Sequence, residues 1–131
     1  MPVYSKAKKK FFDADIDWLV DDIRVVLLDG TEYAPALTVH EFLSDVPLGA
    51  RLGMSDALTG KSDAGGVLDA DDATVPAVSG SVVSAYVLVK YTGTDATSPL
   101  IQHKSFTPQV PPSGPMTLRW DNGLAKIFSY Q

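Results

Sequence analysis

The sequence predicts a mainly β protein: a single-domain antiparallel β-sandwich or barrel, jelly-roll-like, with one or two short helices and an extended N-terminal arm. Two segments, residues 81–91 and 116–121, alternate apolar and polar side chains, which is typical of strands that bury one face. The chain has 10 Gly and 9 Pro, and every acidic residue except Glu32 and Glu41 is Asp, which favours turns over helix interiors. A length of 131 residues with 45% apolar residues suits one domain with one modest core.

Residues 1–12 are predicted to form a basic N-terminal arm, and residues 13–131 the β-sandwich domain. The arm is too highly charged to bury much apolar surface alone, so we expect it to order on a partner. The alternative is a solvated tail without a binding role. Aromatic side chains beside the lysines favour the binding role, and the partner-contact candidates in the arm are Tyr4, Lys8, Lys9, Lys10, Phe11 and Phe12.

The domain is expected to begin with a helical turn and a buried strand. Residues 13–22 place Ile16, Leu19 and Val20 at helical spacing, which predicts a short amphipathic turn of helix. Residues 23–28 are apolar and partly β-branched and close on an Asp-Gly pair, so they predict a largely buried strand followed by a turn.

An irregular segment follows this first strand. A second short helix is expected at residues 39–43, because Thr38 and Glu41 have the spacing of a capping box. Residues 53–73 are rich in Gly, Asp, Ser and Thr, and they predict at most one or two weak edge strands.

The second half of the chain carries the clearest strand signals. Residues 81–91 predict a long central strand, and residues 100–106 predict a second one. Residues 116–121 and 124–130 are expected to form a hairpin, since the Asn-Gly pair at residues 122–123 is a strong signal for a tight turn.

Four prolines in residues 107–115 forbid a central strand there and predict an extended loop. Because such a loop is poor in internal hydrogen bonds, it can order on a neighbour. Its partner-contact candidates are Pro108, Val110, Pro111 and Pro112. The apolar faces of the predicted elements indicate a core that contains Trp18, Val25, Leu27, Val87, Val89, Leu118, Trp120 and Ile127.

Composition argues against several classes of protein. A net charge of -5 and a pI of about 4.7 disfavour binding to the phosphate backbone, so no nucleic-acid partner is expected. The chain has no Cys, which excludes disulfides, thiolate metal sites and cysteine nucleophiles. Its apolar runs are far shorter than the roughly 20 residues that cross a bilayer, and residues 1–10 lack the apolar region of a signal peptide. We therefore expect no membrane partner and synthesis in the cytoplasm.

No motif predicts catalysis or a cofactor. Residues 60–62, Gly-Lys-Ser, resemble the end of a phosphate-binding loop, but the position that requires the first glycine is Ser55. The acidic residues at 69–72 lack the glycine and glutamate of a calcium loop, although an irregular divalent-cation site there stays open. His40 and His103 are the only histidines and have neither zinc-site spacing nor a nucleophile elbow beside them. The prediction is a protein that is not an enzyme and holds no cofactor.

Several segments together resemble a known family. They occur in the expected order from residue 11 to the C-terminus and are residues 15–25, 40–47, 58–61, 69–72, 90–94, 97–101, 120–123 and 126–128. In this set the chain resembles a family of small structural proteins of tailed-bacteriophage virions. Two segments depart from the family pattern, namely the Pro-rich loop at 107–115 and the basic residues 1–10.

The resemblance implies a structural role, most like that of capsid decoration or cement proteins. Such a protein binds the outside of the expanded head, so the implied partners are the major capsid protein and further copies of the same chain, as a dimer or a trimer. The implied location is the capsid surface of the virion, with assembly in the host cytoplasm. A tail adaptor or fibre-associated subunit is the alternative, and a carbohydrate-binding module that stacks sugars on Tyr33, Tyr86 or Tyr130 is a further one.

Overall fold

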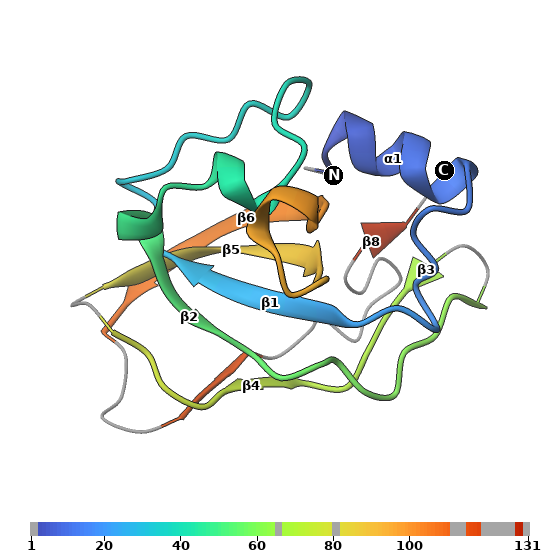
Figure 1. The fold of residues 1–131 in the computed structure, drawn as a ribbon. Coiled ribbons are helices and arrows are strands. Elements are labelled where there is room, and N and C mark those ends of the chain that lie inside the picture. The colour runs from blue at the N-terminus through green and yellow to red at the C-terminus, as the bar shows by residue number, and fades with distance from the viewer. Residues whose placement is uncertain (1–2, 65–66, 80–81, 111–114, 119–127, 130–131) are drawn as a thin grey trace.

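Four antiparallel strands form the main sheet of the computed structural model, in the order β2-β1-β5-β6 (Figure 1). These strands are β1 (Ile23–Leu28), β2 (Arg51–Met54), β5 (Val83–Lys90) and β6 (Leu100–Gln109). Two short antiparallel pairs accompany the sheet. They are β3 (Val67–Leu68) with β8 (Phe128–Ser129) and β4 (Ala73–Val75) with β7 (Met116–Leu118). The structure describes residues 3–64, 67–79, 82–110, 115–118 and 128–129.

This architecture confirms the predicted fold class: the protein is mainly β, its sheets are antiparallel, and the arrangement is sandwich-like. Within the described ranges the strands do not close into a barrel. The helical elements with described bounds are α1 (Ser5–Phe12) and the 3-10 turns η1 (Leu43–Asp45), η2 (Leu48–Ala50) and η4 (Asp95–Thr97).

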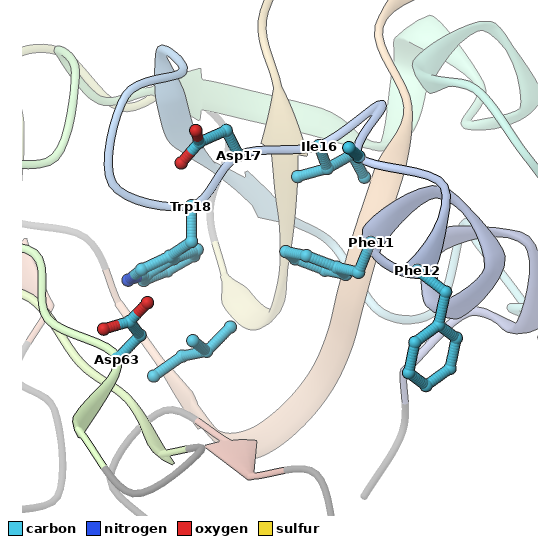
Figure 2. A pocket seen from close by; sticks show the side chains of 8 residues that line it. Phe11, Phe12, Ile16, Asp17, Trp18 and Asp63 are labelled. Carbon is cyan, nitrogen blue, oxygen red and sulfur yellow. The ribbon is translucent and has the colours of Figure 1, made fainter.

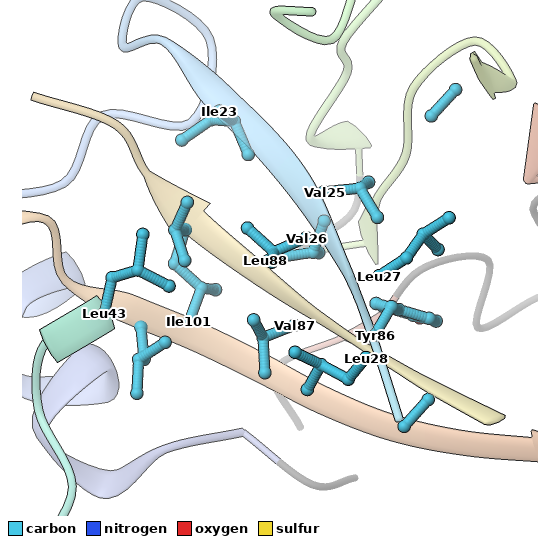
Figure 3. Close-up of a cluster of buried hydrophobic side chains, with 14 of the residues drawn as sticks. Ile23, Val25, Val26, Leu27, Leu28, Leu43, Tyr86, Val87, Leu88 and Ile101 are labelled. Atoms are coloured by element: carbon cyan, nitrogen blue, oxygen red, sulfur yellow. The ribbon is translucent and has the colours of Figure 1, made fainter. Parts of the chain in front are cut away.

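The apolar core is centred on β1 and β5, which lie side by side in the interior of the sheet (Figure 3). The predicted core residues Val25, Leu27, Val87 and Val89 are fully buried, and Trp18 is 4% exposed. The long central strand predicted for residues 81–91 is confirmed, since β5 lies in the interior of the sheet. Both of its faces are largely buried, as Val87 and Leu88 show, because an interior strand with apolar residues on both faces requires cover on both.

The prediction of an extended N-terminal arm is wrong for residues 5–12, which form helix α1. The helix forms because it buries one apolar stripe at helical spacing. In this stripe Tyr4 is 0% and Ala7 1% exposed, and Phe11 packs against the core. Backbone hydrogen bonds fix the start of the helix: the Tyr4 amide donates to the Ile101 carbonyl oxygen over 3.0 Å. The stripe was not recognised in the sequence, because the charge of the four lysines between its positions indicated a solvated segment.

The amphipathic helical turn predicted for residues 13–22 is confirmed only in part: the Asp21 amide donates to the Asp17 carbonyl oxygen over 2.9 Å, which closes one turn, but the predicted buried face is wrong. Ala14 has a φ of 64°, a left-handed conformation that ends α1 and reverses the chain. Beyond it the chain turns Ile16 and Trp18 inward, at 3% and 4% exposure, whereas Val20 is 78% exposed. The buried side chains therefore precede or begin this turn, and the apolar face predicted at Leu19 and Val20 is exposed.

The predicted helix at residues 39–43 is wrong as well, because the helical turn there is η1, which begins only at Leu43. Thr38 does not cap it. Instead, the Asp45 carboxylate accepts hydrogen bonds from the backbone amides of Glu41 over 2.8 Å and Phe42 over 3.1 Å. A short acidic side chain that bonds the nearby backbone stabilises a tight turn in place of a longer helix.

Strand β6 continues through Pro108 to Gln109, so the extended loop predicted from residue 107 begins later than expected. Proline is tolerated there because β6 is an edge strand of the main sheet and its pairing with β5 is irregular near this end. The predicted hairpin at residues 122–123 lies outside the described residues, as do Trp120 and Ile127. Leu118 is described only as the last residue of β7.

Candidate docking surface

The outward face of α1 combines lysines with an exposed aromatic ring. Lys8 and Lys9 are exposed, and Phe12 is 79% exposed. Lys9 forms an ion pair with Asp13, one helical turn later. None of the ion pairs among the described residues involves Lys8. Lys8 and Phe12 are four residues apart and therefore share one face of the helix.

The opposite face of α1 is fixed by a buried chain of hydrogen bonds. The Tyr4 and Tyr33 hydroxyls lie 2.7 Å apart, and the Tyr33 hydroxyl lies 2.8 Å from His40 Nδ1. The Ala36 amide also donates to Nδ1, over 3.2 Å, so this nitrogen is an acceptor. Tyr33 consequently donates to His40 and accepts from Tyr4, and burial raises the pKa of both tyrosine hydroxyls.

Ion pairs add to this attachment. Glu41 lies 2.9 Å from the ammonium group of Lys10 and 3.6 Å from that of Lys6. The hydrogen bond from Lys10 lowers the pKa of the Glu41 carboxyl. Lys10 also lies over the Phe42 ring, 5.3 Å from its centroid, in a cation–π contact. Lys10 therefore holds the helix to the body of the protein, whereas Lys8 points away from it.

A groove with a volume of about 400 Å³ lies beside the C-terminal end of α1 (Figure 2). Its lining is mostly apolar and consists of Phe11, Phe12, Ala14, Ile16, Asp17, Trp18, Asp63 and Leu68. Figure 2 shows Phe11 and Trp18 facing the groove, whereas Phe12 points away from both. The Trp18 indole nitrogen donates to the Asp69 carbonyl oxygen over 3.2 Å, which joins the groove wall at residues 16–18 to the wall around β3.

Two carboxylates, Asp17 and Asp63, lie at the rim of this groove. Asp17 accepts a hydrogen bond from the Leu19 amide over 3.2 Å, and no ion pair among the described residues includes Asp17 or Asp63. The nearby cation, Lys61, is partly buried and donates to the Asp21 carbonyl oxygen over 2.5 Å. Lys61 interacts electrostatically with Asp17 and partly offsets its charge, so the rim charge is mainly that of Asp63, next to Lys8 and the Lys9–Asp13 pair on α1.

The end of β6 is a second exposed apolar surface. Pro108 is exposed, and Val110 is 79% exposed. Figure 1 shows this end of β6 on one side of the molecule and α1 on the other. Pro111 and Pro112, the other contact candidates of this segment, lie outside the described residues.

The structure therefore separates the predicted contact residues into three groups. Lys8, Lys9 and Phe12 lie on the outward face of α1, and Phe11 lines the groove. Lys10 is half-buried and paired with Glu41. Tyr4 is a correction, because it is 0% exposed and belongs to the core of this fold.

The predicted sugar-stacking face is wrong for the two tyrosines that the structure describes. Tyr33 is 5% and Tyr86 is 4% exposed, so neither ring offers a face to a ligand. Both are held by hydrogen bonds, since the Tyr86 hydroxyl donates to Gln102 Oε1 over 3.1 Å. Tyr130 lies outside the described residues.

Sequence reasoning did not find the groove, because its walls come from residues 11–18 and from 63–68, which only the tertiary structure brings together. One local signal was present, since Ile16 and Trp18 are large apolar side chains two residues apart, and both are buried.

Among the described residues, no three His, Asp or Glu side chains converge in a way that could hold a metal ion, and this includes residues 69–72. None of the helices in the described part of the chain is long and apolar enough to span a membrane. No protein-family model matches the chain, and no curated protein matches it significantly.

Proposed function

We propose that this protein is a structural component of a tailed-bacteriophage virion, which binds the outside of the capsid and stabilises the expanded head as a decoration or cement protein. The observation that carries the proposal is the presence of two exposed contact surfaces on opposite sides of one small β domain. The first is the α1 face with Lys8, Lys9 and Phe12, and the second is the β6 end with Pro108 and Val110. A subunit with two such surfaces can bind two neighbours at once.

Bridging is the physical requirement of a cement protein. An expanded head has seams between its capsomers, and a small domain that binds on both sides of a seam adds two modest interfaces. Their free energies combine because the second contact forms at a high effective concentration once the first is made. Summed over many copies, such contacts stabilise the shell without any chemical reaction.

The charge of the chain fits assembly at high concentration. A net charge of -5 makes copies of the protein repel one another at long range, which favours solubility before assembly. The exposed cations of α1 are a local exception to this negative surface. The family resemblance of residues 15–25 and 40–47 supports the same role.

The test is cosedimentation of the full chain with expanded empty heads that lack this protein. We expect saturable binding at a fixed ratio to the major capsid protein. Val110→Asp should weaken binding at least tenfold, because it places a charge in the apolar β6 end. Leu48→Asp is the matched control, since Leu48 is 75% exposed and belongs to neither surface, and it should bind like the unaltered chain.

Failure to bind heads at any concentration would contradict the proposal. Saturable binding to purified tails in the same assay would then support a tail adaptor or fibre-associated subunit. Equal loss of binding in the Val110 and Leu48 variants would contradict the role of the β6 end.

A further inference from the structure

The ring of Tyr33 lies between the two histidines of the chain. It stacks on His40, with 5.5 Å between the ring centroids and 24° between the ring planes. It meets His103 of β6 edge to face, with the centroids 5.9 Å apart. Tyr33 is 5% and His103 is 9% exposed, so the Tyr33 ring covers His103 on the main sheet. A movement of Tyr33 away from the sheet therefore uncovers His103.

The start of α1 is bound to the same two elements by backbone hydrogen bonds. The Ser5 amide donates to the Leu37 carbonyl oxygen over 2.8 Å, which joins α1 to the segment that carries Tyr33. The Tyr4 amide donates to the Ile101 carbonyl oxygen over 3.0 Å, which joins α1 to β6. The hydroxyls of Tyr4 and Tyr33, 2.7 Å apart, add a third link. We therefore expect α1 and Tyr33 to leave the sheet together.

Each donor of the buried hydrogen-bond chain has an acceptor while His40 is neutral. Tyr4 donates to Tyr33, and the Tyr33 hydroxyl and the Ala36 amide both donate to His40 Nδ1. Because Nδ1 is an acceptor, the hydrogen of the neutral ring is on Nε2, and an added proton must bind Nδ1. The Ala36 amide then loses its acceptor and the two hydroxyls must reverse. A proton on His40 therefore weakens the link between Tyr33 and α1.

The carboxylates near His40 are ionised throughout the range in which histidine titrates. Asp45, on η1, interacts with His40 through space, and backbone hydrogen bonds lower the pKa of its carboxyl. Glu41 pairs with Lys6 and Lys10 of α1, and the hydrogen bond from Lys10 lowers the pKa of its carboxyl. The Asp45 charge favours a proton on His40, so it offsets part of the cost of reversing the hydrogen-bond chain.

His103 has no such compensation among the described residues. It faces the neutral Tyr33 ring, its neighbour on β5 is Val87, and none of the described ion pairs includes it. Burial lowers the pKa of its imidazole. A proton on His103 would be a buried charge without a counter-ion, so its uptake requires that Tyr33 move away.

We propose that Tyr4, Tyr33, His40 and His103 form a pH-sensitive latch, which holds α1 to the sheet at neutral pH and releases it when the histidines are protonated. Above the ordinary histidine value of about 6.5 the latch is closed. As the pH falls below that value, the released state binds protons that the closed state excludes, so the latch opens. Strands β1 and β5 stay paired, because their hydrogen bonds do not involve α1. The inference goes beyond the proposed function, since it concerns the free protein and does not depend on what α1 contacts.

The test is hydrogen exchange of the full chain between about pH 7.5 and about pH 5, with each rate divided by that of an unstructured peptide at the same pH. We expect the protection of the α1 amides to fall at least tenfold over this range. His103→Gln should remove most of the fall, and the double variant with His40→Gln should remove all of it. Lys9→Gln is the matched control, because Lys9 is exposed on α1 outside the latch, and it should show the same fall as the unaltered chain.

Protection of α1 that is independent of pH would overturn the inference, because α1 would then open without uncovering His103. A fall that persists in the double variant would also overturn it, because groups other than the histidines would cause it. NMR titration of both imidazoles in the unaltered chain requires no variant. We expect His103 to take up its proton only below the ordinary histidine value, and uptake at that value with α1 still protected would contradict the latch.

Discussion

The central sheet and the α1 region are held in place by different forces. Strand β1 pairs with β5 along its whole length, and both strands bury nearly all of their side chains in an apolar core. Helix α1, by contrast, is attached by a small number of specific contacts, namely two backbone hydrogen bonds at its start, the Tyr4–Tyr33–His40 chain and the Glu41 ion pairs. Among residues 3–12, the buried side chains are those of Val3, Tyr4 and Ala7. The comparison teaches that the sheet provides the stability, whereas polar contacts determine the position of the helix.

The largest effect is expected from a cavity in the sheet. Leu27 is fully buried in β1, so Leu27→Ala should lower the free energy of unfolding by about 2–5 kcal/mol. Chemical denaturation measures this loss. The exposed Leu48 serves as the comparison, and Leu48→Ala should change stability by less than about 0.5 kcal/mol. A loss below that of the Leu48 variant would contradict the assignment of β1 to the core.

A smaller and local effect is expected at the hydrogen-bond chain. Tyr4→Phe removes one buried hydroxyl and leaves the Tyr33 hydroxyl bonded to His40, so the cost should be about 1 kcal/mol. Hydrogen exchange should become faster in α1 and stay unchanged in β5. If hydrogen exchange became equally faster in α1 and β5, the two would open as one unit. That result would contradict the separate attachment of α1 to the sheet.

The pH dependence of stability sharpens the comparison further. Burial lowers the pKa of His103, on β6, so the unfolded chain binds a proton at higher pH than the folded one. Stability is therefore full above the ordinary histidine value of about 6.5 and decreases as the pH falls below it. Urea denaturation at several pH values measures the slope, and His103→Gln should reduce it. If the pH dependence of stability were unchanged in His103→Gln, it would arise from groups other than His103.

The smallest effect is expected from the surface ion pairs of α1. Glu41→Gln removes the charge that faces Lys6 and Lys10, and partly exposed pairs of this kind contribute about 0.5 kcal/mol. The loss should disappear at high salt, because screening already weakens the pairs in the unaltered protein. Thermal denaturation at low and high salt tests this, and a loss that persists at high salt would show that Glu41 acts by packing.

The same division explains what the sequence could predict. The apolar run of β1 and the alternation of β5 specify strands locally. The burial of both faces of β5, by contrast, depends on its interior place in the sheet. Helix α1 could not be predicted from its own residues. Its buried positions, Tyr4 and Ala7, are few, and the groups that fix them, such as Tyr33 and the Ile101 carbonyl, are distant in sequence.

The groove was beyond sequence reasoning for a related reason. Asp63 and Leu68 meet Phe11 and Trp18 only because β3 is brought beside the end of α1. Nothing in the local pattern of residues 63–68 indicates that contact. By contrast, Phe12 and Val110, which the sequence analysis names as partner-contact candidates, are exposed in the structure.

Hydrogen exchange of the full chain, measured free in solution and bound to expanded heads, tests the proposed function most directly. The account predicts that β1 and β5 are protected in both states, and that the end of β6 up to Val110 gains protection only on heads. At a head concentration that is saturating by cosedimentation, unchanged exchange at the end of β6 would contradict its role as a capsid contact. Unchanged exchange at every segment of the chain would contradict binding to the head itself.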